Sequence, residues 1–163
     1  MKFLIIDDDI IRIKPLIELL KLDDVVFDQV FYTEDAWEKL YHYHSKTRYS
    51  LIILDLIIPA KNMREYHGDY DVQAEDRGVA FLDDFRGVKT FDTKNKLMNE
   101  MRKKVRESYK DIPIAVLTAR VFKTKRVDLK EQIGGKAFSI KQKMPRPLEV
   151  YISELKDEAE KYT

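Results

Sequence analysis

Five short apolar runs alternate along the chain with stretches of helical spacing, and few folds accommodate that alternation. The runs are rich in β-branched or aromatic residues and span positions 3–6, 25–27, 51–54, 112–117 and 137–140. Several are apolar at every position, as expected for strands of a parallel sheet that is covered on both faces. Between the runs, apolar residues recur every three to four positions, as do Ile13, Leu16, Ile17 and Leu20. The pattern predicts a doubly wound α/β domain.

Length and composition narrow the class of protein further. A chain of 163 residues suits one domain, residues 1–163, with a sizeable core. It contains no cysteine, which excludes disulfides, thiolate catalysis and zinc–thiolate or iron–sulfur centres. The formal net charge of +1 makes nucleic acid an unexpected partner. Because no apolar run is long enough for a signal peptide or a transmembrane helix, we expect a cytoplasmic protein with no membrane partner.

Two segments depart from the strand–helix alternation. Residues 60–76 are polar and predict a long loop, which in a compact domain is usually functional or mobile. Residues 95–109 predict an additional helix with a narrow apolar stripe, formed by Leu97, Met98, Met101 and Val105. The wider stretch 89–110 holds eight Lys/Arg and three Asp/Glu. We expect a solvated helix face there, and a docking surface for an acidic partner or for nucleic acid is the alternative.

Polar side chains follow or end four of the five apolar runs. They are Asp7, Asp8, Asp9, Asp55, Thr118 and Lys141. The remaining run, the second, leads to Thr33 and Glu34, which stay outside the predicted site. In an open parallel sheet ligands collect beyond the carboxyl ends of the strands, so the listed side chains are expected to meet at one edge.

Taken together, these residue types suit phosphoryl transfer. Clustered carboxylates repel one another, and a hard divalent cation such as Mg²⁺ relieves the repulsion. A carboxylate beside Mg²⁺ can attack phosphorus, while an amine and a hydroxyl neutralise the transferred oxygens. Taken singly, Asp55 or Thr118 could equally cap a helix, and Lys141 could be a solvated charge. Asp9 is assigned to capping the first helix, and the joint pattern of the others predicts a site.

The same residues resemble the receiver domain of two-component response regulators. The similarity lies in residues 3–9 with their acidic cluster, 51–59 around Asp55, 113–119 around Thr118 and 134–141 up to Lys141. It covers nearly the whole chain except two inserted segments, about 60–76 and 88–110. The resemblance implies a flavodoxin-like fold, in which a five-stranded parallel sheet of strand order 2-1-3-4-5 has helices on both faces.

The resemblance also implies a role for each acidic residue. Asp55 is expected to accept phosphate from a histidine kinase or a histidine phosphotransfer protein. Asp8 and Asp55 are expected to bind Mg²⁺ through their side chains. Asp7 is expected to act on the ion through water, and Ile57 to offer its backbone carbonyl.

Residues after the fourth and fifth runs complete the implied switch. Lys141 is expected to pair with Asp55 and then with the phosphoryl group. Thr118 is expected to hydrogen-bond that group, with Ala119 in the same phosphate-binding segment. Phe138 is the switch aromatic, which turns inward and is not a ligand. The output is expected to be contact with a downstream protein, or a homodimer through the last helix face.

Two departures from the family pattern and one additional cation bear on these roles. Gln142 follows Lys141 where the family usually has proline, which leaves Lys143 as a competitor for the lysine role. The Asp-Gly pair that normally comes soon after the phosphoacceptor appears only in residues 76–78, so the loop beside Asp55 is enlarged. Arg120, two residues past Thr118, could also contact an anion.

Three functions therefore compete. The leading hypothesis is a stand-alone receiver domain, a phosphoacceptor regulator and not an enzyme, which signals in a two-component phosphorelay. The second is a haloacid-dehalogenase-type phosphatase in which Asp7 is the nucleophile and Asp9 the acid and base, and it leaves Asp55 unexplained. The third is a pseudo-receiver that serves as an interaction module without being phosphorylated.

Overall fold

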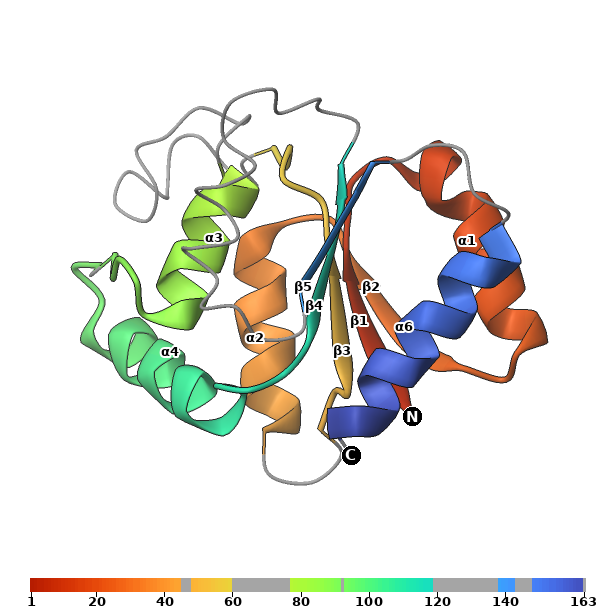
Figure 1. Cartoon of the computed structure of the whole chain (residues 1–163). Coiled ribbons are helices and arrows are strands. Elements are labelled where there is room, and N and C mark those ends of the chain that lie inside the picture. The colour runs from red at the N-terminus through yellow and green to blue at the C-terminus, as the bar shows by residue number, and fades with distance from the viewer. Residues whose placement is uncertain (45–47, 60–76, 92, 119–137, 143–147, 163) are drawn as a thin grey trace.

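Five parallel strands form one sheet at the centre of the molecule (Figure 1). The computed structural model describes residues 1–44, 48–59, 77–91, 93–118, 138–142 and 148–162. The strands are β1 (Lys2–Ile6), β2 (Val26–Val30), β3 (Leu51–Leu54), β4 (Ile114–Thr118) and β5 (Phe138–Gln142). Their order is β2-β1-β3-β4-β5, and every neighbouring pair is parallel. The predicted sheet and its strand order are confirmed.

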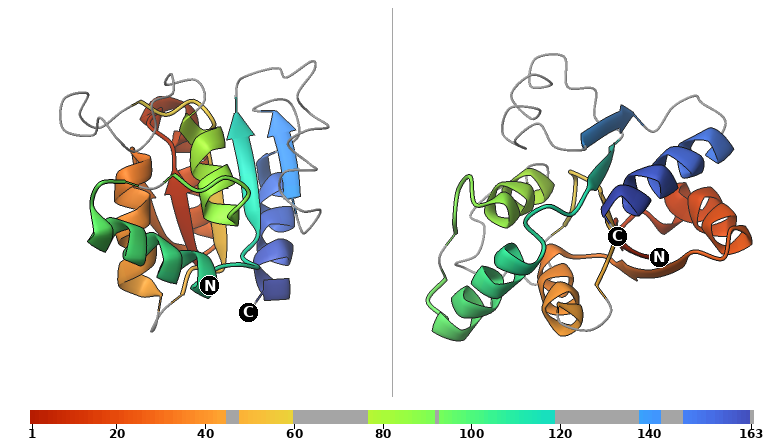
Figure 2. Two further views of the ribbon diagram at one scale, coloured as in Figure 1. Left: turned by 90° about the vertical axis from the view of Figure 1, so that its left-hand side faces the viewer. Right: turned by 60° about the horizontal axis from the view of Figure 1, so that its bottom comes forward.

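Helices cover both faces of the sheet (Figures 1 and 2). On one face lie α1 (Ile10–Leu22) and α6 (Leu148–Tyr162). On the other lie α2 (Thr33–Tyr43), α3 (Arg77–Arg86) and α4 (Lys96–Ser108). The last of these is the helix predicted over residues 95–109. The molecule is therefore a doubly wound α/β domain, as the sequence predicts.

The first apolar run shows why these strands lack a polar face. Phe3 and Ile5 pack with residues of α1 and α6, whereas Leu4 and Ile6 pack with residues of α2 and α3. All four side chains are fully buried. Because successive side chains of a strand point to opposite faces, a strand covered on both faces needs apolar residues at every position.

Polar side chains set where two helices begin. Asp9 caps α1, since its carboxylate accepts a hydrogen bond from the backbone N–H of Arg12 at 3.0 Å. Asn95 caps α4 and accepts from the N–H groups of Leu97 and Met98. Each cap satisfies N–H groups that have no partner inside the helix. The assignment of Asp9 to a cap is confirmed.

The sequence places Thr33 and Glu34 at the end of the second strand, and this prediction was wrong. β2 continues to Val30, and α2 begins at Thr33, so Thr33 and Glu34 belong to a helix. The run is interrupted by Asp28, whose carboxylate lies 2.8 Å from Lys2 Nζ and also accepts from the Tyr49 hydroxyl. A charge with such partners is tolerated in a strand, but hydropathy alone does not show the partners.

Some predicted features lie outside the described residues. They are the polar loop at 60–76 and the positions Ala119, Arg120 and Lys143. Among the described helices, none is long and apolar enough to cross a membrane.

We expect the folded state to lose stability as the pH rises above about 10, because buried tyrosines resist ionisation. Burial raises the pKa of Tyr109 to about 12 and also raises the pKa values of Tyr49 and Tyr151. The stability linked to these groups is complete below the unfolded-state pKa and is lost as the pH passes through the folded-state values. Urea unfolding at a series of alkaline pH values measures the slope. A Tyr151→Phe variant should show a shallower decline, and an unchanged slope would contradict the assignment.

Candidate functional site

Three carboxylates meet at the carboxyl edge of the sheet. Asp7 and Asp8 follow β1, and Asp55 follows β3. These two strands are neighbours in which Ile6 pairs with Leu54, so Asp7 and Asp55 leave the sheet at the same level. One carboxylate oxygen from each of the three aspartates lies within 4.8 Å of the other two. The structure thus brings together the three acids that the sequence singles out as metal ligands.

Backbone contacts hold the two buried acids in place. The N–H of Asp55 donates to the carbonyl of Ile6 at 2.9 Å, which extends the β1–β3 pairing by one residue. The side chain of Asp55 accepts from the N–H of Ile57 at 3.3 Å. On the neighbouring strand, the N–H of Asp7 donates to the carbonyl of Val30 at 3.1 Å. Each carboxylate is therefore fixed by the end of a strand and not by a flexible loop.

The cluster carries more negative charge than a buried edge normally tolerates. Asp7 is 1% exposed and Asp55 is 5% exposed, whereas Asp8 is open to solvent. Like charges at this spacing repel strongly where water is largely excluded. A cation at the cluster removes that repulsion, so the site has an electrostatic reason to bind one.

The donor set suits Mg²⁺. This ion prefers oxygen ligands at about 2.0–2.1 Å in octahedral geometry, so oxygens that it binds directly are at most about 4.2 Å apart. Three carboxylate oxygens within 4.8 Å of one another match that size, with a water completing the contact to one of them. The exposed side of Asp8 leaves room for the waters that Mg²⁺ usually keeps.

The backbone brings two further predicted residues to the same edge. Thr118 is the last residue of β4, two positions beyond the Val116 that pairs with Leu54. Lys141 pairs with Leu117 inside β5, whereas the sequence analysis places it just after that strand. Phe138 is the first residue of β5. The side-chain roles of all three stay predictions.

Asp9 has a different role from its two neighbours. Its carboxylate caps α1 and forms an ion pair with Arg12 at 2.9 Å. It does not belong to the three-carboxylate cluster, and Asp55 does. This arrangement lends no support to the phosphatase hypothesis, which requires Asp7 and Asp9 to act together and gives Asp55 no task.

One close contact beside Asp55 was not predicted from the sequence. The N–H of Gly78, in the first turn of α3, donates to the carbonyl of Leu56 at 3.1 Å. A Cβ atom at Gly78 would lie 2.4 Å from the carbonyl oxygen of Asp55. The Asp-Arg-Gly of residues 76–78 is the sequence signal for this contact, because a glycine allows a close approach of two backbones.

A buried ion pair next to this contact was also missed. Glu34, at the start of α2, is 3% exposed and lies 3.9 Å from Arg77 at the start of α3. The hydroxyl of Thr33 donates to the other oxygen of Glu34 at 3.3 Å. The pair connects the N-terminus of α2 to that of α3, beside the segment that carries Asp55.

Solved structures share this architecture. A CheY-like receiver domain protein from Methanospirillum hungatei matches with a TM-score of 0.60 and 12% identity, over 99% of this chain and 94% of that one. The HemR receiver domain from Leptospira biflexa, in its non-phosphorylated form, matches with a TM-score of 0.58 and 20% identity, over 97% and 93%. The receiver domain of a sensor histidine kinase from Pseudomonas aeruginosa matches with a TM-score of 0.58 and 13% identity, over 98% and 97%. That structure holds a magnesium ion in its active-site cleft.

These matches concern structure and not sequence. No protein-family model matches the chain, and no curated protein matches it. At identities of 20% or less the likeness shows the fold alone. The chain therefore has the fold of response regulator receiver domains, in agreement with the resemblance seen in the sequence.

Proposed function

We propose that this chain is a phosphorylation-controlled signalling switch of a two-component system, acting in the cytoplasm. Asp55 accepts a phosphoryl group with the help of Mg²⁺, and the phosphorylated domain signals by protein–protein contact. The observation that carries the proposal is the meeting of Asp7, Asp8 and Asp55 at the carboxyl edge of a sheet with the receiver fold. A carboxylate cluster at this place in the fold is the arrangement that phosphoryl transfer to an aspartate requires.

Asp55 and the residues around it have separate roles in phosphoryl transfer. A carboxylate oxygen of Asp55 attacks phosphorus, and the bond from phosphorus to the donor breaks, so that the electron pair leaves with the donor's nitrogen or oxygen. Asp8 and Asp55 hold the metal by their side chains, Asp7 through water and Ile57 through its carbonyl. Mg²⁺, when bound, neutralises charge on the transferred oxygens.

Residues at the end of β4 and in β5 respond to the phosphoryl group on Asp55. Lys141 pairs with the phosphoryl oxygens, and the Thr118 hydroxyl donates to another of them, with Ala119 beside it. Phe138 then changes its packing, which alters the surface formed by the last strand and helix. Lys143 takes the lysine role if Lys141 does not. Such a switch couples a local charge to a packed element with two arrangements.

The proposed partners follow from this chemistry. The phosphodonor is a histidine kinase or a histidine phosphotransfer protein, since a phosphohistidine readily gives its phosphoryl group to a carboxylate. The recipient of the signal is a downstream protein or a second copy of the chain through α6. The chain itself turns over no separate substrate, beyond promoting its own phosphorylation and dephosphorylation.

The test is Mg²⁺-dependent phosphorylation by acetyl phosphate. We expect the intact protein to gain one hydroxylamine-labile phosphoryl group and the Asp55→Asn variant to gain none. Asp7→Asn should reduce the gain strongly, because it removes a charge from the metal cluster. The matched control is Asp9→Asn, which keeps a good helix cap and lies outside the cluster, so it should be phosphorylated like the wild type.

Two other outcomes would point away from the proposal. Rapid turnover of a phosphate ester that survives Asp55→Asn and is abolished in Asp7→Asn would assign the protein to the phosphatases. A wild-type protein that neither gains phosphate nor binds Mg²⁺ would be a pseudo-receiver.

A further inference from the structure

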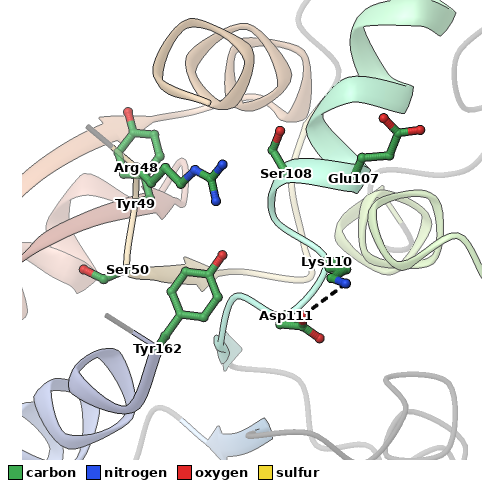
Figure 3. A pocket seen from close by; sticks show the side chains of 8 residues that line it. All are labelled: Arg48, Tyr49, Ser50, Glu107, Ser108, Lys110, Asp111 and Tyr162. Atoms are coloured by element: carbon green, nitrogen blue, oxygen red, sulfur yellow. Dashed lines mark ion pairs between the residues drawn. The ribbon is translucent and has the colours of Figure 1, made fainter. Parts of the chain in front are cut away.

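A pocket lies at the opposite end of the sheet from the carboxylate cluster, where α4 and α6 end (Figure 3). Its volume is about 440 Å³, which is within the usual range of small-molecule sites. The lining residues are Arg48, Tyr49, Ser50, Glu107, Ser108, Lys110, Asp111 and Tyr162. They come from the entry to β3, the end of α4 and the end of α6. The pocket thus depends on α4, the helix that the sequence analysis predicts as an addition.

A cation and a phenol face the pocket from one side. Figure 3 shows the guanidinium of Arg48 and the hydroxyl of Tyr162 directed into the same space. The Nε of Arg48 donates to the carbonyl of His44 at 3.0 Å, and this contact does not use the two Nη groups. Within the described ranges no carboxylate forms an ion pair with Arg48. Burial raises the pKa of Tyr162, so its hydroxyl keeps its proton and can donate.

The opposite wall is held rigidly but carries a loosely paired amine. Arg86 donates to the carbonyl of Lys110 at 2.7 Å and to that of Ile112 at 2.6 Å, which fixes the backbone of the wall. Lys110 Nζ lies 3.9 Å from Asp111, and the Lys110 side chain is 76% exposed. An exposed pair at this distance contributes little energy, so Lys110 is free to turn toward a ligand. Glu107 points away from the space between Arg48 and Tyr162 (Figure 3).

We propose that this pocket binds a small organic oxyanion, a carboxylate or a phosphate monoester, between Arg48 and Tyr162. A guanidinium presents paired N–H donors that match the oxygens of either group, and such charge-assisted hydrogen bonds are the strong ones. The Tyr162 hydroxyl donates a third hydrogen bond to the ligand. The Lys110 amine turns toward the ligand from the opposite wall of the pocket. The carboxylate cluster at the other edge repels anions unless a cation is bound, so it does not compete for the same ligand.

The proposed ligand would connect parts of the chain that are far apart in sequence. It bridges the segment before β3 to the end of α6, against the wall formed by the end of α4. Anything that binds only the folded state stabilises it by mass action. A ligand in this pocket would therefore stabilise the folded state whether or not Asp55 is phosphorylated. The proposal does not rest on the proposed function.

The experiment titrates the full chain with inorganic phosphate and, separately, with succinate, in Mg²⁺-free buffer that contains neither ion. Calorimetry or backbone amide chemical shifts report the binding. We expect saturable binding at one site, weakened about tenfold or more in Arg48→Ala, because charge-assisted hydrogen bonds are lost. Tyr162→Phe should weaken binding by a smaller factor. The Arg48 side chain is exposed, and Tyr162→Phe removes only a hydroxyl group that lines the pocket. We therefore expect both variants to remain folded, which circular dichroism would show.

The matched control is Lys161→Ala, which removes a positive charge next to Tyr162 without touching the pocket. Lys161 is 68% exposed and pairs with Glu158, so its loss should leave the affinity unchanged. Binding of phosphate alone or of succinate alone would identify which source of the oxyanion the pocket takes. Absence of saturable binding of either probe would overturn the proposal. So would equal affinities of Arg48→Ala and the wild type, or an equal loss in Lys161→Ala.

Discussion

Replacing Asp84 by alanine is expected to lower the free energy of unfolding by about 3–5 kcal/mol, because it leaves a buried guanidinium without its carboxylate. Asp84 of α3 is fully buried, and Arg102 of α4 is 1% exposed. Asp84 Oδ2 lies 3.1 Å from Arg102 Nη1, and its Oδ1 lies 2.6 Å from Arg106 Nη1. The Cζ atom of Arg102 also lies 5.3 Å from the centroid of the Trp37 ring. Urea denaturation of the two proteins measures the difference.

The neighbouring carboxylate supplies the control. Asp83 precedes Asp84 on the same helix, and burial raises its pKa with an opposing effect from Lys89, so the fold gains nothing from its charge. Its contacts with Val88 and Lys89 use the backbone carbonyl, which alanine keeps. We expect Asp83→Ala to change stability by less than about 1 kcal/mol. Equal losses in the two variants would show that the ion pair does not hold α4 in place.

A double variant tests whether the cost of Asp84→Ala comes from the unpaired buried charge or from lost packing. In Asp84→Leu combined with Arg102→Met, apolar side chains replace both buried partners. Such replacements of a buried ion pair are often neutral or stabilising, whereas removal of one partner is costly. The double variant should therefore be more stable than Asp84→Ala. A double variant that is less stable would indicate that the helices require the pair for their alignment.

The same ion pair explains why the apolar residues of α4 do not mark its whole buried face. Of the apolar stripe predicted for this helix, Val105 is fully buried, but Leu97 is 76% exposed. The buried position next to the stripe is taken by Arg102, which a hydropathy pattern assigns to solvent. Its burial depends on Asp84, 18 residues earlier in the chain. A pairing between two helices leaves no local signal in either of them.

The sheet was predictable because its signal is local. A strand covered on both faces must be apolar at every position, and the segments 3–6 and 51–54 show this without any knowledge of their neighbours. The edge at which Asp7 and Asp55 meet follows from the same fact, since parallel strands end on one side. The apolar run 25–27 covers only part of β2, because Asp28 inside the strand gains its partners from β1 and from the entry to β3.

The parts of the site that could not be predicted depend on how separate segments approach. The sequence shows a glycine at position 78, but only the fold shows that α3 begins against the backbone of Asp55. Likewise, the pocket beside Arg48 exists only because α4 and α6 end at the same end of the sheet. Spacing along the chain predicts which residues share an element, and not which elements leave a space between them.

Gly78→Ala is expected to destabilise the protein by about 1–3 kcal/mol or more and also to impair phosphorylation of Asp55. An added Cβ would lie 2.4 Å from both the Asp55 carbonyl oxygen and the Leu56 Cα, far inside contact distance. Both atoms belong to the backbone, so no side-chain rotation relieves the clash. Either α3 moves away and loses the hydrogen bond from Gly78 to Leu56, or the segment that carries Asp55 shifts. Urea denaturation and the acetyl phosphate reaction measure the two effects.

Gly87→Ala separates the loss of stability from the effect on the site. Gly87 has φ of +69°, a conformation that costs alanine about 1–2 kcal/mol, and an added Cβ there would meet no atom within 4 Å. This variant should therefore lose stability yet be phosphorylated like the wild type when folded. Gly78→Ala, compared at a temperature where both variants are folded, should be phosphorylated more slowly. Equal rates for the two would mean that the contact at Gly78 supports the fold without positioning Asp55.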